Sequence, residues 1–187
     1  MEPSSSFSKR KNNIDPVELY NYTYASYDEL YRQEQFLKYE YIIINKGFLP
    51  KGNILDLGCG TGLLLDFLRE KKIKYKRIVC IDPSEKMLEL AVYKSGNDPR
   101  VIFIQGYAED LPFDNEVFDA IYMFTVWDNI INKEKAFQEL RRVLRRKGIA
   151  IISVIDPRKK GASINNLLSK LKYIGKEKDF FFIYEKE

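Results

Sequence analysis

A glycine-rich segment and the carboxylate that opens it are the residues whose types and spacing point most directly to ligand chemistry. Residues 56–62 read DLGCGTG, and three glycines allow a backbone to turn sharply and approach a ligand closely. Nicotinamide- and flavin-binding proteins share such turns, but their usual spacing is G-x-G-x-x-G, whereas these glycines follow G-x-G-x-G. The carboxylate of Asp56 would repel a pyrophosphate, so it favours a cationic ligand.

A second carboxylate, Asp82, follows the glycine segment by about 20 residues, the distance at which dinucleotide-binding folds place an acidic ribose ligand. Asp82, Pro83 and Ser84 also form a good helix start, because a serine can cap free backbone N–H groups and the helix dipole favours a carboxylate there. The two roles are compatible, and we favour the ribose role for Asp82.

Four segments, in order, resemble motifs of the class I methyltransferases that depend on S-adenosylmethionine (SAM). The first two are the glycine segment and residues 81–84 (IDPS). The third is residues 105–113 (QGYAEDLPF) with Phe118 and Asp119, and the fourth is residues 139–144 (ELRRVL) with Gly148. The resemblance covers roughly residues 52–155. It implies a Rossmann-like fold, SAM as cofactor and transfer of its methyl group to an acceptor.

The resemblance also implies which residues bind SAM. Asp56 would orient the glycine segment and the methionine end, whereas Ala108, through its backbone N–H, and Glu109 would lie beside the adenine. Many relatives carry Asp or Asn where this chain has Tyr107, so stacking, a hydroxyl contact and simple packing all stay open for that ring. The cofactor-binding residues that the resemblance implies come from the ends of the first four strands and from the N-terminal segment. They are Asp56, Gly58, Cys59, Gly60, Gly62, Asp82, Pro83, Ser84, Met87, Ala108, Glu109, Phe124 and Tyr27.

Residues 124–129 (FTVWDN) follow the predicted fourth strand and are expected to face the methyl group and the acceptor. The segment lacks the Asn/Asp-Pro-Pro-Tyr/Phe motif of enzymes that methylate nucleobase amines or glutamine amides, which argues against those acceptors. Trp127 and Asp128 are candidate catalytic residues, as an aromatic wall and as a general base or cation anchor. The alternative is that Trp127 packs in the core and Asp128 caps the next helix.

The N-terminal region is predicted to cover the site. Apolar residues recur every three to four positions between residues 15 and 48, as in a helix, and residues 14–50 are expected to form a helical lid. Tyr27 is the best candidate to reach the cofactor from this lid. The alternative is that Tyr27 belongs to a tyrosine-rich packing face.

Three adjacent cations, Arg158, Lys159 and Lys160, follow the predicted fifth strand, on the rim where a methyl group would leave. They could hold a phosphate or an acidic protein surface, and we predict an anionic macromolecule, RNA before protein, as acceptor. A solvated loop is the alternative. The cluster at residues 141–147 is expected to be structural, because cations suit a helix C-terminus. A small-molecule acceptor and a SAM-binding subunit without catalysis remain alternatives, as do a monomer and a homodimer.

The coarse pattern alternates strands with helices. Strands are expected at residues 53–57, 77–81, 101–105, 118–124, 149–155 and 179–184, the last pairing as a hairpin near Tyr173; helices are expected at 61–71, 84–94, 132–146 (ended by Gly148) and 163–171. Such alternation predicts an α/β three-layer sandwich with a mostly parallel seven-stranded sheet and an antiparallel last strand. Ligands then bind at the carboxyl ends of the strands.

Composition sets the remaining limits. The chain has 187 residues, which predicts one methyltransferase domain at 14–187, with its core at 51–187, after a flexible tail at 1–13. It has no histidine, which excludes an imidazole base and histidine metal ligands, and no metal is expected. Cys59 and Cys80 form neither a disulfide framework nor a zinc motif. No apolar run is long enough to cross a bilayer, so a cytoplasmic protein is expected.

Overall fold

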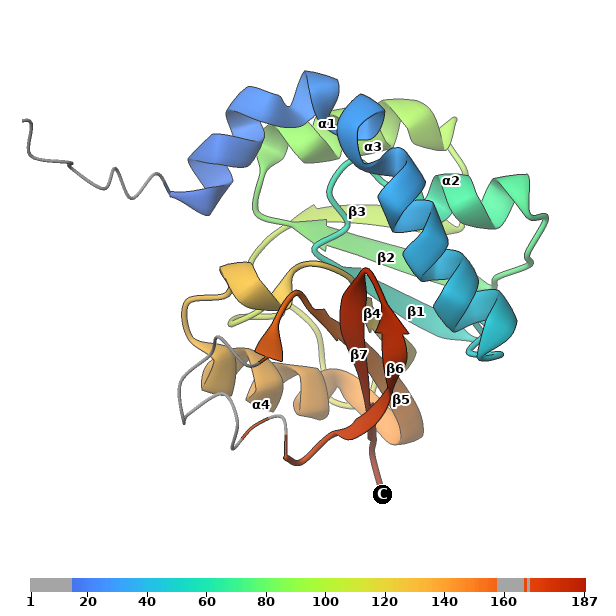
Figure 1. The fold of residues 1–187 in the computed structure, drawn as a ribbon, viewed down its shortest axis with the longest axis vertical. Helices are drawn as coiled ribbons and strands as arrows, with labels where there is room; N and C mark the ends of the chain where they lie inside the picture. The colour runs from blue at the N-terminus through green and yellow to red at the C-terminus, as the bar shows by residue number, and fades with distance from the viewer. Residues whose placement is uncertain (1–14, 158–166, 168) are drawn as a thin grey trace, which may run out of the picture.

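The computed structural model describes residues 15–157, 167 and 169–187, and Figure 1 shows how its elements are arranged. The helices are α1 (Pro16–Tyr39), the π-helical η1 (Glu40–Asn45), α2 (Leu63–Glu70), α3 (Glu85–Ser95), the 3₁₀-helical η2 (Trp127–Asn129) and α4 (Lys133–Val143). The strands are β1 (Asn53–Leu57), β2 (Arg77–Asp82), β3 (Val101–Gln105), β4 (Phe118–Met123), β5 (Leu144–Val154), β6 (Lys172–Glu177) and β7 (Asp179–Glu185).

The seven strands form one sheet in the order β3-β2-β1-β4-β5-β7-β6. The pairs from β3 to β5 are parallel, whereas β7 runs antiparallel to both β5 and β6. The predicted mostly parallel sheet with an antiparallel last strand is confirmed. Because the strand order reverses between β1 and β4, a crevice opens at their carboxyl ends, where ligands of such sheets bind.

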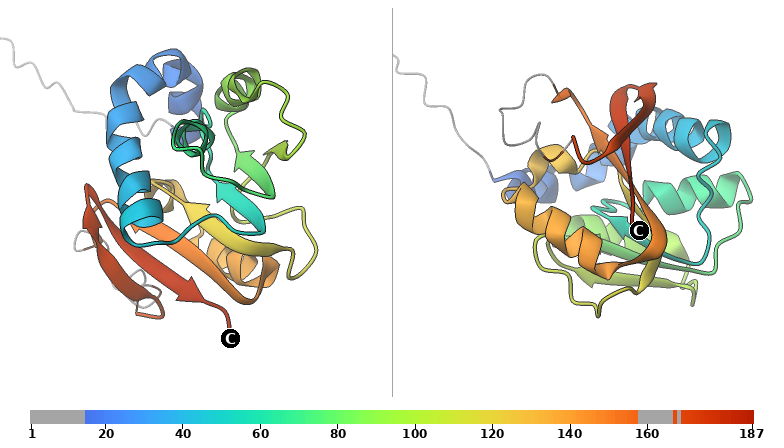
Figure 2. Two further views of the ribbon diagram at one scale, coloured as in Figure 1. Left: turned by 90° about the vertical axis from the view of Figure 1, so that its right-hand side faces the viewer. Right: turned by 90° about the horizontal axis from the view of Figure 1, so that it is seen from below.

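Helices cover both faces of this sheet. Helices α1, α2 and α3 lie together on one face and α4 lies on the other (Figure 2). Each face has its own buried apolar cluster. One cluster includes Phe67 of α2 and Tyr122 of β4, and the other includes Trp127 of η2 and Leu140 of α4. Burial on both faces explains why β4 and the second part of β5, residues 149–154, read as nearly continuous apolar runs in the sequence.

Side chains that can accept backbone hydrogen bonds set where the helices begin. Asp15 accepts from Val17 N at the start of α1, Ser84 accepts from Met87 N at the start of α3, and Asn132 accepts from Lys135 N at the start of α4. Each bond satisfies an N–H group that the first helical turn leaves free. The predicted cap of Ser84 is therefore confirmed.

The predicted end of α4 is wrong. We expected this helix to run to Arg146 and to end because of Gly148, but it ends at Val143 and β5 begins at Leu144. The carbonyls of Arg142 and Val143 accept hydrogen bonds from residues 116 and 117, just before β4, so pairing with that neighbour outweighs the helical tendency of the arginine-rich segment. Gly148 is required by crowding instead, because a Cβ there would lie 2.9 Å from Arg145 O and 3.0 Å from Asp119 O.

The C-terminal hairpin is confirmed, because β6 pairs antiparallel with β7 through Tyr173 and Phe182. The predicted tail at 1–13, the basic loop Arg158–Lys160 and most of the predicted helix 163–171 lie outside the described residues. Among the helices that the structure describes, none is long and apolar enough to span a bilayer.

Candidate functional site

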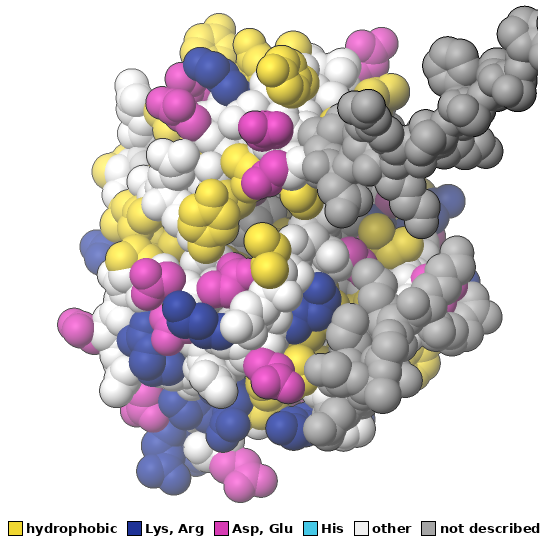
Figure 3. Space-filling view, turned by 90° about the vertical axis from the view of Figure 1, so that its left-hand side faces the viewer, with side chains coloured by type: hydrophobic (Ala, Val, Ile, Leu, Met, Phe, Trp, Pro, Cys, Tyr) yellow, Lys and Arg dark blue, Asp and Glu magenta, His cyan; other side chains and the backbone are white. Residues whose placement is uncertain are grey.

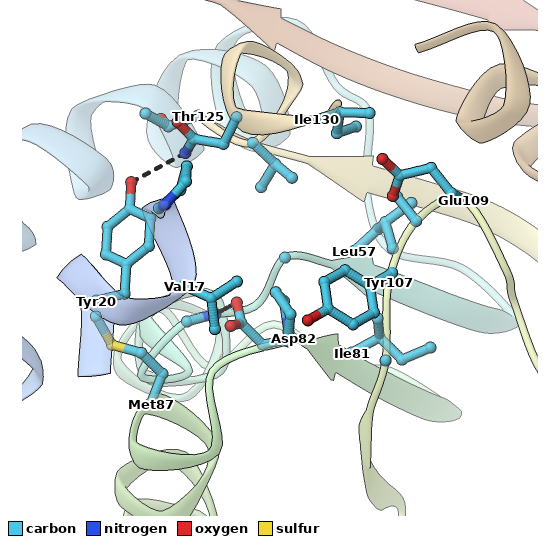
Figure 4. Close-up of a pocket in the computed structure, with 18 of the residues that line it drawn as sticks. Val17, Tyr20, Leu57, Ile81, Asp82, Met87, Tyr107, Glu109, Thr125 and Ile130 are labelled. Atoms are coloured by element: carbon cyan, nitrogen blue, oxygen red, sulfur yellow. Dashed lines mark hydrogen bonds between the residues drawn. The ribbon is translucent and has the colours of Figure 1, made fainter. Parts of the chain in front are cut away.

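A cavity of about 390 Å³ lies at the carboxyl ends of β1, β2 and β4, beneath the first turns of α1. This volume lies in the range of about 300–1,000 Å³ typical of small-molecule sites. Figure 4 shows side chains from several elements around it, with Thr125 and Ile130 across the cavity from Asp82. We call the part near Gly60 and Asp82 the β2 end, and the part near Thr125 the β4 end.

The glycine segment shapes one wall of the cavity through its backbone. Gly58 N and Cys59 N donate to Ile81 O over 2.8 and 3.0 Å, which ties the segment to the end of β2. Gly58 has φ +77°, and a Cβ on it would lie 2.1 Å from Val126 Cγ2. Gly58 is therefore required both by its left-handed conformation and by the close approach of Val126.

Asp82 joins the glycine segment to the start of α3. Its Oδ2 accepts from Gly60 N and its Oδ1 from Ser84 N, each over 2.9 Å. Burial raises the pKa of Asp82, and these two hydrogen bonds partly oppose that rise. The carboxylate lines the cavity, so the helix-start role is satisfied while a lone pair of each oxygen stays available to a ligand.

Asp56 lies at the end of β1 and does not line the cavity. Its side chain is almost fully buried, and its Oδ2 has no hydrogen-bond partner among the described residues. Burial, with a further contribution from the charge of Asp82, raises the pKa of Asp56 to about 8. A cation bound nearby would stabilise the ionised form of this carboxyl, so the site fits a sulfonium or ammonium group.

The wall next to β3 comes from the loop after that strand. Tyr107 and Ala108 line the cavity, and the Tyr107 side chain is 55% exposed. Glu109 also lines it, and its Oε1 accepts from Ile131 N and Asn132 N, both over 3.2 Å. Glu109 therefore links this loop to the segment before α4. In Figure 4 the hydroxyl of Tyr107 points toward Asp82.

Helix α1 contributes the opposite wall. Tyr27, the predicted lid residue, lines the cavity, and its ring lies 6.1 Å from that of Tyr20 and 4.8 Å from that of Tyr31. The sequence predicted no individual role for Tyr20, whose hydroxyl accepts from Asn129 Nδ2 over 3.0 Å and so links α1 to η2 (Figure 4). Only the fold brings positions 20 and 129 together.

The structure brings most of the predicted cofactor residues to one place. Those that line the cavity are Tyr27, Gly58, Gly60, Asp82, Pro83, Met87, Ala108, Glu109 and Phe124. Four others support the wall from behind: Asp56 and Cys59 are buried, Gly62 begins α2 with φ +79°, and Ser84 caps α3.

The two candidate catalytic residues do not line the cavity. Trp127 is fully buried in the apolar cluster on the α4 face, which fits the packing alternative and leaves no room for an aromatic wall. Asp128 Oδ2 accepts from Ile155 N over 2.9 Å, which ties η2 to the end of β5. The cap of α4 is Asn132 rather than Asp128.

A second hollow, of about 840 Å³, lies between α4 and the C-terminal strands. Figure 3 shows Lys and Arg side chains gathered on the lower part of one face, apart from hydrophobic side chains above them. Arg141 Nε donates to Tyr184 OH, and Arg142 donates to Glu139 and to the carbonyls of Leu111 and Phe113. These intramolecular contacts fit the structural interpretation of the arginine cluster.

Comparison with known proteins assigns the chain to a family. Residues 55–152, just over half of the chain, match the family model described as a methyltransferase domain. The chain belongs to this methyltransferase family. The match runs from β1 to β5 and so contains the glycine segment, Asp82 and the end of β4. SAM is the cofactor that this assignment gives the chain.

Curated relatives and solved structures agree with the assignment. The chain is 32% identical over 115 residues to the ubiquinone/menaquinone biosynthesis C-methyltransferase UbiE of Campylobacter jejuni, an alignment that covers 59% of this chain and 48% of the relative. It thus spans about half the length of the curated relatives that it matches.

Two solved structures are similar. One, from Thermotoga maritima, is described as a SAM-dependent methyltransferase and possible histamine N-methyltransferase; it is 28% identical, with a TM-score of 0.59 and coverage of 75% of this chain and 62% of that one. The other, a putative SAM-dependent methyltransferase from Methanococcus maripaludis, has a TM-score of 0.74 at 19% identity and covers 96% and 97%. The second likeness shows that the fold extends over almost the whole chain.

Proposed function

We propose that the chain transfers the methyl group of SAM to a small-molecule acceptor. The observation that carries this proposal is the cavity at the strand ends, where Asp82 holds the glycine segment and the start of α3 together. When bound, SAM supplies an already activated methyl group, so that positioning of an acceptor accounts for much of the rate.

Each part of the wall has a distinct role in this proposal. Asp82 accepts hydrogen bonds from the ribose hydroxyls, and Gly58 lets the backbone approach the ligand. Tyr107 and Ala108 contact the adenine. Asp56 acts from behind the glycine segment, where its carboxyl group stabilises the cationic end of the ligand. Tyr27 and Tyr20 contact the ligand from α1 and limit access of water.

A small acceptor fits the shape of the cavity better than a polymer does. Helix α1 reaches across the mouth, where Tyr20 is hydrogen-bonded to Asn129. The similar proteins named above carry names that point to a quinone and to histamine. The RNA acceptor predicted from Arg158, Lys159 and Lys160 rests on residues outside the described ones, and no comparison supports it. We therefore prefer the alternative that the sequence left open.

Transfer of radiolabel from SAM tests the proposal. The protein is incubated with methyl-labelled SAM and, separately, with the small-molecule, RNA and protein fractions of a cell extract of the source organism. We expect label in the small-molecule fraction and formation of S-adenosylhomocysteine (SAH). The Gly58→Val variant is the matched control, because it closes the cavity and should transfer no label.

The three fractions also separate the alternatives. Label in RNA or protein would overturn the small-molecule acceptor while leaving the methyltransferase activity in place. Binding of SAH without transfer to any fraction would favour a SAM-binding subunit without catalysis. Absence of both SAM and SAH binding by calorimetry would overturn the proposed function as a whole.

A further inference from the structure

Thr125, the second residue after β4, has a strained backbone. Its φ is +61°, in the left-handed region that β-branched residues rarely adopt. Such conformations persist only where the surrounding structure enforces them, and they concentrate at functional sites. Thr125 lines the β4 end of the cavity, so the strained residue lies on the wall that a ligand contacts.

Hydrogen bonds from three other elements hold Thr125 in this conformation. Thr125 Oγ1 accepts from Lys38 Nζ over 3.0 Å and from Gln35 Nε2 over 3.1 Å, and it donates to Asp179 Oδ2 over 3.1 Å. Thr125 N donates to Ser153 Oγ over 2.6 Å, and Ser153 Oγ donates to Asp179 Oδ2 over 2.8 Å. Helix α1, β5 and β7 thus meet at one residue.

The charged side chains of Lys38 and Asp179 in this network are both buried. The Lys38 side chain is fully buried, and its Nζ lies 3.0 Å from Asp179 Oδ2, itself 5% exposed, and 2.8 Å from Glu34 Oε1. A buried ion pair is not generally a source of stability, because desolvation of both charges opposes their attraction. Because this network combines backbone strain with buried charge, a role in positioning the turn after β4 explains it better than a contribution to the stability of the fold does.

Val126, the residue after Thr125, is the part of the wall that the network positions. The Val126 side chain packs against Gly58, where it occupies the space that a Cβ would fill. The conformation of Thr125 sets the direction in which the chain leaves β4, and so places Val126 against the glycine segment. The turn after β4 and the glycine segment then form one continuous wall.

We propose that Lys38 and Asp179 are positioning residues that lock the turn after β4 against the glycine segment, so that the β4 end of the cavity is built only when α1 is docked. This inference rests on the proposed function, because it assigns the β4 end to the amino-acid and methyl end of the cofactor. The β2 end, with Asp82, holds the adenosine and is independent of the network.

Two ligands that differ only at the β4 end test this inference. SAH carries the adenosine and the amino-acid end, whereas 5′-methylthioadenosine lacks the amino-acid end. In the double variant Lys38→Met/Asp179→Leu both charges are removed together, which avoids an unpaired buried charge. We expect the affinity for SAH, measured by calorimetry, to fall about tenfold, because the ligand would have to restore the strained turn. The affinity for 5′-methylthioadenosine should stay unchanged.

Matched variants keep the test decisive. Arg32→Met removes other contacts of α1, the ion pairs of Arg32 with Asp66 and Glu70 on α2. This variant should leave the ratio of the affinities for SAH and 5′-methylthioadenosine unchanged. If the double variant does not fold, Thr125→Val, which replaces the hydroxyl by a methyl group, should lower SAH affinity, whereas Thr125→Ser, which keeps the hydroxyl, should retain it.

The outcomes separate the inference from the function beneath it. Equal losses for both ligands, or no loss for either, would overturn the positioning role while leaving SAM binding in place. A wild-type protein that binds neither ligand would overturn the proposed function first, and the positioning role with it.

Discussion

The two ends of the cavity are built in different ways. At the β2 end, the contacts join backbone N–H groups to a carboxylate: Gly60 N and Ser84 N donate to Asp82, and Gly58 N donates to Ile81 O. At the β4 end, side chains from α1, β5 and β7 meet Thr125. The first arrangement uses two short segments of the chain, whereas the second joins residues from position 35 to position 179.

The difference shows how rigidity is achieved at each end. The β2 end is fixed by strand pairing and by the start of a helix, so few side chains are needed. The turn after β4 has no such support and adopts a strained conformation, so side-chain hydrogen bonds from other elements must fix it. Loss of one contact should therefore remain local at the β2 end and should spread to several elements at the β4 end.

The largest effect is expected where the two ends touch. Gly58→Val should abolish binding of SAH, because a Cβ at Gly58 would lie 2.1 Å from Val126 Cγ2 and φ is +77°. The ligand-induced thermal shift measures this. Gly96→Ala is the matched control, since Gly96 also has a positive φ (+63°), a Cβ there meets nothing within 4 Å, and the residue follows α3 outside the lining of the cavity. A normal shift in Gly58→Val would contradict the contact between the two ends.

At the β4 end, Lys38→Met alone should lower the free energy of unfolding by about 3–5 kcal/mol, because it leaves the buried Asp179 carboxylate without its cation. Urea denaturation measures the change. The double variant with Asp179→Leu should recover most of the loss. If the single and double variants were equally unstable, Lys38 would be needed for packing rather than for charge. The β4 end would then not depend on paired buried charges, as the comparison of the two ends requires.

At the β2 end, Asp82→Ala should weaken SAH binding by about 1–3 kcal/mol, the usual effect of removing a charged hydrogen-bond acceptor. Calorimetry on the folded variant gives the number. The free energy of unfolding should change less than in Lys38→Met, because the loss of Asp82 leaves two backbone N–H groups without an acceptor but leaves no buried charge without its partner. Unchanged affinity would remove Asp82 from the ribose site.

The smallest difference to be measured is the change in stability between pH 6 and pH 7. Burial raises the pKa of Asp56 to about 8, so the folded protein holds this proton more tightly than the unfolded chain does. The contribution of Asp56 to stability therefore falls as pH rises from about 4 to about 8, by up to about 1.4 kcal/mol per pH unit. Urea midpoints at pH 6 and pH 7 measure it, and Asp56→Asn should reduce the slope. An identical slope in both proteins would show that Asp56 is not protonated when folded.

The β2 end was largely predictable because its signals are local. Glycine spacing, Asp82 at the end of β2 and the Ser84 cap all follow from a few neighbouring residues, and nine of the predicted cofactor residues line one cavity. The end of α4 was not predictable in this way. Residues 144–147 have helix-forming side chains, but Leu144 pairs with Phe118 of β4 and Lys147 N donates to Lys186 O. Local propensity cannot show that competition.

The sequence by itself determined the family, the alternation of strands and helices, and the residues of the β2 end of the cavity, because each depends on periodicity or on groups close together in the chain. The tertiary structure decided the β4 end. It buried Trp127 in the core, brought Tyr20 to Asn129, and joined Lys38 and Asp179 at Thr125. Contacts between residues far apart in the sequence cannot be predicted from local patterns, because only the packing of helices and strands brings a buried charge to its counter-charge.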